Sequence, residues 1–273
     1  MHASDADAGD PRPAAEAGPT GQAATAVLYL YAVVRGDAEG LPDEAYPLCG
    51  IDGAPVGRVV SDGVALVASV LTRGSVRPER RHLAANQAVL KALLQRGDVL
   101  PMAFGTLAAD REAALRLIDR HRQNFTALLA RVAGKVEMGV RVVLDAEDPV
   151  RKVVEREPAL MALRSRYFRA GRKPNQDEMI EMGQMFETAL SRYRSEIVGT
   201  VAEALWRHGI EVKSLPARNE RDMANLACLT PRGLIGDFAG CVAEAAEGFG
   251  DEFAFDHSGP WAPHNFVDLH IEE

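Results

Sequence analysis

The sequence predicts an α+β protein of two domains, and three patterns in the chain indicate this fold class. Residues 26–34 form an apolar run of strand-forming side chains, typical of a central strand. Residues 135–144 alternate polar and apolar side chains, as a half-buried strand does. Residues 177–208 carry apolar side chains at steps of three and four, as a long amphipathic helix does. The expected division is a disordered tail at residues 1–25, an N-terminal ferredoxin-like α+β domain at residues 26–145, and a smaller C-terminal domain with a long helix and an α+β unit at residues 146–273.

The composition is that of a globular protein with a sizeable core. Of the 273 residues, 47% are hydrophobic and 26% are charged. The 31 basic and 39 acidic residues leave a net charge of −8, which argues against nucleic acid as a partner. No apolar run reaches the ~20 residues that span a membrane, so we expect no membrane partner. The 3 cysteines lack a CxxC spacing, which disfavours a zinc site and fits a reducing cytoplasm.

Two further strand signals follow the first strand. Residues 56–60 and 64–70 are β-rich runs on either side of Asp62-Gly63, a dipeptide typical of a hairpin turn. Residues 99–104 predict a short strand that contains Pro101. Because proline has no N–H to donate, this strand is expected at a sheet edge.

Two helices are expected among these strands. The spacing of Leu83, Leu90 and Leu94 predicts a helix with these side chains on its buried face. Asp110 is in position to cap a second helix, and Gly134 is in position to end it. We expect both helices to pack on one face of the sheet.

The second half of the sequence begins with helical patterns. Residues 150–169 are charged with intermittent apolar side chains, and the helix at residues 177–208 would reach roughly 48 Å, enough to bridge two domains. The expected elements after it are strands at residues 210–215 and 223–229, a helix from Thr230-Pro231 to about residue 248, and a short strand at residues 252–255.

No motif for phosphate binding or nucleophilic catalysis occurs in the sequence. The nearest group of metal-binding side chains is C-terminal and comprises Asp256, His257, His264, Asp268 and His270. Their spacing matches no metal motif, so we expect solvent-facing polar residues and no cofactor. A small-molecule or metal-binding enzyme that uses His257, His264 and His270 stays open as the alternative hypothesis.

Two apolar features are candidate partner-binding surfaces. The first is a helix face, and methionine side chains adapt to many partners, although core packing would explain the same spacing. The second is the proline-containing edge strand, which could accept a partner's strand. The residues are Met179, Met182 and Met185 on the helix, and Pro101, Met102 and Phe104 in the edge strand.

The C-terminal segment contains two aromatic residues, Trp261 and Phe266, which we expect to be structural anchors. Pro260 and Pro263 stiffen the chain around Trp261 and reduce the entropy lost when the segment docks. We therefore expect the Trp261 indole to be buried.

Three stretches of the sequence together resemble the gas vesicle accessory protein family GvpL/GvpF. They are YLYAVV at residues 29–34, VLPMAFGTL at residues 99–107 and SGPWAPHNFV at residues 258–267. The resemblance covers residues 26–268. The sequence departs from the family's C-terminal pattern at Ala262, where proline is usual, and at His264, where tyrosine is usual.

The resemblance implies a non-enzymatic role in gas vesicles, the gas-filled flotation organelles of some prokaryotes. It implies an N-terminal domain of modified ferredoxin type, a cytoplasmic and gas vesicle localisation, and contacts with the hydrophobic gas vesicle shell protein and other accessory proteins. A shell subunit apolar enough to face gas would aggregate in water. A soluble partner with an apolar binding face would prevent this.

Overall fold

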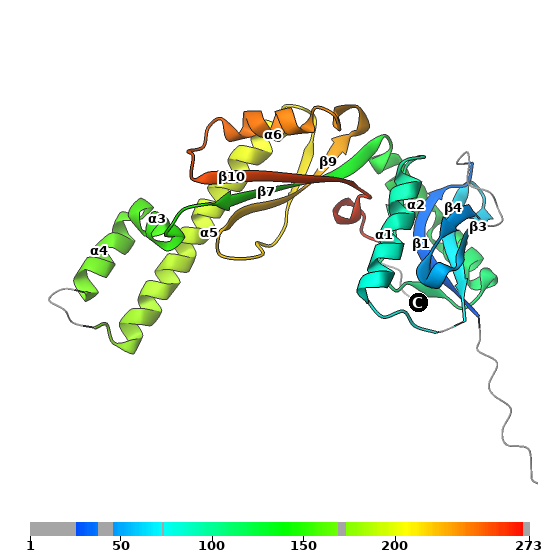
Figure 1. Ribbon diagram of the computed structural model, residues 1–273, viewed down its shortest axis with the longest axis horizontal. Coiled ribbons are helices and arrows are strands. Elements are labelled where there is room, and N and C mark those ends of the chain that lie inside the picture. The colour runs from blue at the N-terminus through cyan, green and yellow to red at the C-terminus, as the bar shows by residue number, and fades with distance from the viewer. Residues whose placement is uncertain (1–25, 38–45, 73, 169–172, 270–273) are drawn as a thin grey trace, which may run out of the picture.

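The computed structural model describes residues 26–37, 46–72, 74–168 and 173–269, which form two antiparallel sheets flanked by helices (Figure 1). The expected tail and His270 lie outside the described residues. The predicted α+β class is confirmed as a mixed fold of helices and two antiparallel sheets. The helices within the described residues are α1 (Arg80–Leu94), α2 (Arg111–Val132), α3 (Pro149–Arg156), α4 (Pro158–Tyr167), α5 (Gln176–Trp206) and α6 (Phe238–Ala246).

The first sheet has the strand order β2-β3-β4-β1-β5, and β6 also pairs with β1. Its strands are β1 (Val27–Arg35), β2 (Tyr46–Cys49), β3 (Pro55–Ser61), β4 (Val64–Leu71), β5 (Leu100–Pro101) and β6 (Leu107–Ala108). The predicted hairpin is confirmed, because β3 and β4 pair around Asp62 and Gly63, whose φ angles are 40° and 79°. Pro101 lies in β5 at the edge of the sheet, as predicted.

The helices α1 and α2 cover opposite faces of the first sheet. Tyr29 and Leu30 are neighbours in β1, so their side chains point to opposite faces. The Tyr29 hydroxyl donates a hydrogen bond of 3.1 Å to Asn86 of α1. Leu30 instead belongs to the same buried cluster as Ile118 of α2. The expectation that both helices pack on one face is therefore wrong.

The buried face of α1 also differs from the predicted stripe. Leu83 is 42% exposed, whereas His82 and Asn86 are buried. Burial of these polar side chains is tolerated because both are hydrogen-bonded. His82 Nε2 lies 3.1 Å from the Asp52 carboxylate, and Asn86 accepts the bond from Tyr29.

The second helix follows the sequence prediction closely. The Asp110 carboxylate accepts a hydrogen bond of 2.6 Å from the backbone N–H of Ala113, which is the predicted N-cap. Gly134 follows the helix with a φ angle of 69°, a conformation that glycine adopts without strain. Both ends of α2 are therefore determined by local sequence.

The second sheet has the strand order β10-β7-β9-β8, and all its neighbours are antiparallel. Its strands are β7 (Lys135–Leu144), β8 (Glu211–Ser214), β9 (Asp222–Pro231) and β10 (Phe253–Trp261). The strand predicted at residues 135–144 is thus observed as β7, but it belongs to this sheet and not to the sheet of the N-terminal residues. The helix predicted from Thr230 to about residue 248 is present as α6, but its predicted start is wrong, because Thr230 pairs with Val136 in the ladder and α6 begins eight residues later, at Phe238.

The helix α5 is the long helix predicted from residue 177, and it begins at the Asn175 cap. One part packs on β8, β9 and α6, and the other part packs on α3 and α4. It runs along the second sheet and extends past it, away from the first sheet (Figure 1). The expectation that it bridges the two sheets is therefore wrong.

The connection between the two sheets is made by α1 instead. Buried side chains of α1 belong to one cluster with side chains of both sheets. The Arg232 guanidinium, just after β9, donates hydrogen bonds of 2.8 Å to the Leu94 carbonyl and 2.6 Å to the Gly97 carbonyl. The Leu94 carbonyl belongs to the last turn of α1 and has no partner within the helix, so Arg232 satisfies a group that would otherwise be unpaired.

We predict that Arg232→Ala lowers the free energy of unfolding by about 1.5–3 kcal/mol, because charge-assisted hydrogen bonds to α1 are lost. Urea unfolding measures this change. Arg232→Lys should recover only part of it, since an ammonium group lacks the planar fork of the guanidinium. The control is Arg131→Ala, which breaks an exposed pair of 2.8 Å with Glu211 and should cost less than about 1 kcal/mol. Equal losses in the two alanine variants would contradict this role of Arg232.

Candidate interaction surfaces

Three helices at the end of the molecule remote from the first sheet form a helical arm, which comprises α3, α4 and residues 176–190 of α5 (Figure 1). Each helix has a clear start signal. Asp148 caps α3 by accepting a hydrogen bond of 2.9 Å from the Arg151 N–H, and Pro158 opens α4. Asn175 and Glu178 form a reciprocal capping box at the start of α5, with both bonds at 2.9 Å.

Polar contacts hold the three helices together. Arg156 at the end of α3 forms an ion pair of 3.0 Å with Glu196 of α5. Arg192 of α5 pairs with Glu157, which lies between α3 and α4. The Tyr167 hydroxyl at the end of α4 donates a hydrogen bond to Glu181 of α5. These contacts fix the shape of the surface between the helices.

An apolar groove of about 350 Å³ lies between the helices of the arm. Its apolar lining consists of Val150, Val154, Leu160, Phe168, Met179, Met182 and Phe186. Met179 is 49% exposed and Phe168 is 50% exposed, so large apolar side chains remain in water at this surface. A concave apolar surface of this kind is typical of a binding site.

The charged side chains that line the groove leave it with a positive edge. The Asp148 carboxylate caps α3, and Arg151 pairs with Glu155 at 2.6 Å. Arg164 also lines the groove and makes no ion pair with any residue in the part of the chain that the structure describes. A partner with a carboxylate beside its apolar face would therefore complement the groove.

The methionine face predicted from sequence lies partly in this groove. Met179 and Met182 line it, whereas Met185 is partly exposed and does not. Met179 is not packed in a core against a neighbouring domain, because about half of its side chain is in contact with water. Val150 of α3 and Phe168, which follows α4, also line the groove but were not predicted, because they are distant from Met179 in the sequence.

The second predicted surface, the proline-containing edge strand, is not available to a partner through its side chains. Pro101 and Met102 are buried, and Met102 lies in the cluster between the first sheet and α2. Phe104 is partly buried, and its ring packs edge-on against Tyr29 with 6.0 Å between the centroids. A partner would therefore have to pair with the backbone of this edge strand, and the binding surface at Pro101, Met102 and Phe104 stays a prediction.

The two C-terminal aromatic residues lie in different surroundings. Trp261 is 45% exposed, and its indole N–H lies 3.4 Å from the Ser258 hydroxyl, so the expectation of a buried indole is wrong. Trp261 ends β10, the edge strand of the second sheet, where a side chain has few neighbours. Phe266 is buried against Ala227 and Leu229 on the outer face of that sheet.

The C-terminal segment is also fastened by Glu137 of β7. Strand alternation predicts an exposed carboxylate, but Glu137 is buried beneath this segment. It accepts hydrogen bonds of 2.8 Å from the Asn265 backbone N–H and 2.7 Å from the Asn265 side-chain amide. Burial raises the pKa of Glu137, and the two bonds from Asn265 offset only part of this rise.

We predict that Glu137 makes the protein less stable as the pH rises. Because its folded pKa lies above the usual 4.5, the native state keeps a proton that the unfolded chain has lost. Its contribution to the free energy of unfolding is complete below pH 4.5 and is lost as the pH rises through the folded pKa. Glu137→Gln should flatten the pH dependence of urea unfolding above pH 4.5. The exposed Glu203→Gln serves as the control, and equal slopes in wild type and Glu137→Gln would contradict the prediction.

The C-terminal histidines form no metal site in the part of the chain that the structure describes. His257 packs its ring against Phe238, with 5.9 Å between the centroids, and His264 is exposed. No group of three histidine, cysteine or acidic side chains that could hold a metal occurs among the described residues. None of the helices within the described ranges is both long enough and apolar enough to cross a membrane.

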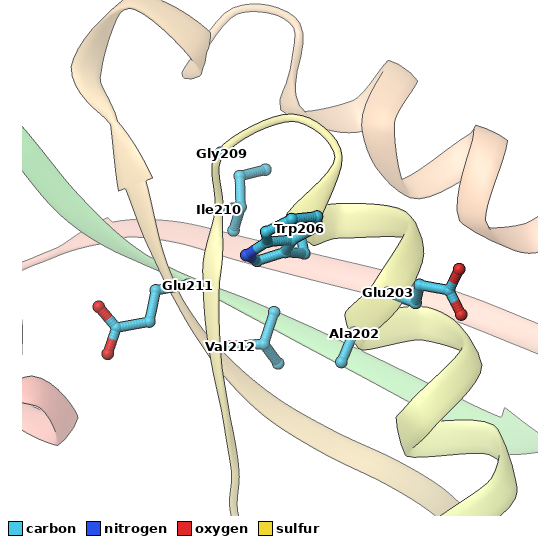
Figure 2. A pocket seen from close by; sticks show the side chains of 7 residues that line it. All are labelled: Ala202, Glu203, Trp206, Gly209, Ile210, Glu211 and Val212. Carbon is cyan, nitrogen blue, oxygen red and sulfur yellow. The ribbon is translucent and has the colours of Figure 1, made fainter.

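A second hollow lies between the last turn of α5 and β8, and Figure 2 shows its lining. The cavity measures about 630 Å³. Trp206 lies between the helix and the strand and is 71% exposed (Figure 2). This surface was not among those predicted from the sequence, although one signal was available: Trp206 directly follows Leu205, the last buried residue of the α5 stripe, and so falls outside the buried face.

Comparison with known proteins identifies the family. The family described as gas vesicle synthesis protein GvpL/GvpF matches residues 27–268. The chain belongs to the GvpL/GvpF family. Gas vesicle protein F of Microcystis aeruginosa is 26% identical over 90% of this chain and 99% of that protein. Gas vesicle protein L1 of Halobacterium salinarum is 26% identical over 88% of this chain and 89% of that protein.

Solved structures share the architecture of this GvpL/GvpF protein. The crystal structure of GvpF from Microcystis aeruginosa superposes with a TM-score of 0.72 at 26% identity, over 89% of this chain and 99% of that one. The structure of GvpF from an Anabaena species gives a TM-score of 0.75 over 90% of this chain and 100% of that one; at 22% identity it shows the fold alone. The resemblance carried by the three sequence motifs is thereby confirmed.

Proposed function

We propose that this GvpL/GvpF protein is a non-catalytic assembly or minor structural protein of gas vesicles, which binds the hydrophobic shell subunit and other accessory proteins in the cytoplasm. The single observation that carries the proposal is the apolar groove of the helical arm, where Met179 and Phe168 stand half exposed. The gas vesicle names of the relatives support the cellular role.

The occupant proposed for the groove is an amphipathic helix of the shell subunit. A groove between helices accommodates a further helix that presents apolar side chains at steps of three and four. Arg164 favours a helix with a carboxylate beside this apolar face. Burial of the helix would keep the shell subunit from aggregating before it joins the wall.

We also propose a division into two domains that differs from the expected one. Since β7 pairs with β9 and β10, the boundary falls near Gly134, between α2 and β7. The N-terminal part, of modified ferredoxin type, would remain free to contact other accessory proteins. The C-terminal part would present the groove to the shell subunit.

We predict that Met179→Asp reduces capture of the shell subunit at least about tenfold, because a carboxylate in the groove must lose its water when an apolar helix binds. Co-expression of the tagged chain with the shell subunit, followed by pull-down, measures capture. The matched control is Ile180→Asp, since Ile180 is the next residue of α5, is 51% exposed and does not line the groove.

Two outcomes would count against the proposed function. Equal capture by the Met179 and Ile180 variants would rule out the groove as the binding site. Normal vesicles in a host that lacks this gene, together with the absence of any captured shell or accessory protein, would rule out the assembly role itself. Equal thermal midpoints of the two variants exclude unfolding as the cause of any loss.

A further inference from the structure

The strand β8 is an open edge of the second sheet. Within the described residues it pairs with β9 and with no second strand. In an antiparallel ladder, alternate residues direct their N–H and C=O groups to opposite sides. The Leu215 N–H donates to β9, whereas the Ile210 N–H donates to the last turn of α5. The backbone groups of Val212 and Ser214 therefore point away from β9.

We propose that β8 pairs with β8 of a second copy of this chain, antiparallel and centred on Val212. A two-fold axis at this residue joins the two four-stranded sheets into one continuous sheet. The outward backbone groups of Val212 then bond to those of Val212 in the second copy. Ser214 lies opposite Ile210 of the second copy; the Ile210 N–H is already bonded to the Leu205 carbonyl, so at this pair only the Ser214 N–H and the Ile210 carbonyl would bond to each other.

The charges of β8 select this register. With Val212 at the centre, Glu211 lies opposite Lys213 of the second copy, and Lys213 lies opposite Glu211. Pairs at these positions are close together and on the same face of the sheet. A pairing centred on Glu211 or on Lys213 would instead oppose two identical charges, which is destabilising.

The contacts that Glu211 and Lys213 make within one copy do not prevent them from pairing with a second copy. Glu211 pairs with Arg131 at 2.8 Å, and the Lys213 ammonium donates to the Asn265 carbonyl at 2.9 Å. Glu211 and Lys213 are both exposed, and exposed ion pairs contribute little to stability. Both side chains can therefore turn toward a second copy at small cost.

The indole of Trp206 supplies apolar surface beside the same edge. It is the most exposed large apolar side chain among the described residues. The cavity between α5 and β8 leaves room next to the indole for side chains of the second copy (Figure 2). Tryptophan is enriched at the buried centre of protein interfaces, which fits its place near the proposed axis.

Self-association at β8 is independent of the proposed function. Met179 in the groove and Trp206 at the edge lie on the same helix, roughly 40 Å apart at about 1.5 Å per residue. Pairing at β8 therefore leaves the groove of each copy open.

Sedimentation velocity of the full chain over a concentration series tests the proposal. The wild-type chain should shift from one copy to two as its concentration rises. Glu211→Lys and Lys213→Glu should each weaken this association about tenfold, because each places like charges opposite one another twice. The double variant Glu211→Lys/Lys213→Glu recreates both opposite-charge pairs and should restore the association to within about threefold of wild type.

Two further variants separate the interface from folding. Arg131→Gln removes the intramolecular partner of Glu211, leaves β8 unchanged, and should associate as wild type does. Val212→Pro removes an outward N–H that has no role in the β9 ladder, so it should fold normally and stay a single copy. A wild-type chain that remains a single copy throughout the series overturns the proposal. Single charge variants that associate like wild type, or a double variant that associates no better than the single ones, also overturn it.

Discussion

The arrangement of the two sheets depends on the hydrogen bonds that Arg232 donates at the C-terminal end of α1. The last carbonyls of a helix have no partner within the helix, and here one guanidinium, from the residue that follows β9, binds the Leu94 carbonyl at the end of α1 and the Gly97 carbonyl just beyond it. The C-terminal segment also connects the two sheets, since Phe266 packs on the second sheet and Val267 packs in the core of the first. Together these contacts set the position of the helical arm relative to the first sheet.

Structural features that depend on residues close together in the sequence could be predicted from the sequence. The Asp62-Gly63 turn, the Asp110 cap and the alternation of β7 each depend on a few neighbouring residues, and each is present in the structure. Met179 and Met182 were identified as a candidate binding face for the same reason, because helical spacing places them on one side of α5.

Structural features that depend on contacts between residues far apart in the sequence could not be predicted. Asn86 is buried because Tyr29, 57 residues away, donates a hydrogen bond to it, and Glu137 is buried because Asn265 folds over it. Thr230 has the residue type and the following proline of a helix cap, yet pairing with β7 keeps it in a strand. The groove itself unites side chains from three helices, and no single helix pattern indicates which of them meet.

We propose that the groove of the helical arm receives an apolar helix of the gas vesicle shell subunit. Hydrogen–deuterium exchange of the full chain, alone and with saturating shell subunit, tests this binding site, because it reports the protection of each helix and strand. We expect slower exchange in α3, α4 and the first half of α5, and unchanged exchange in the first sheet. Slower exchange confined to the first sheet, or unchanged exchange in the helical arm, would contradict the claim.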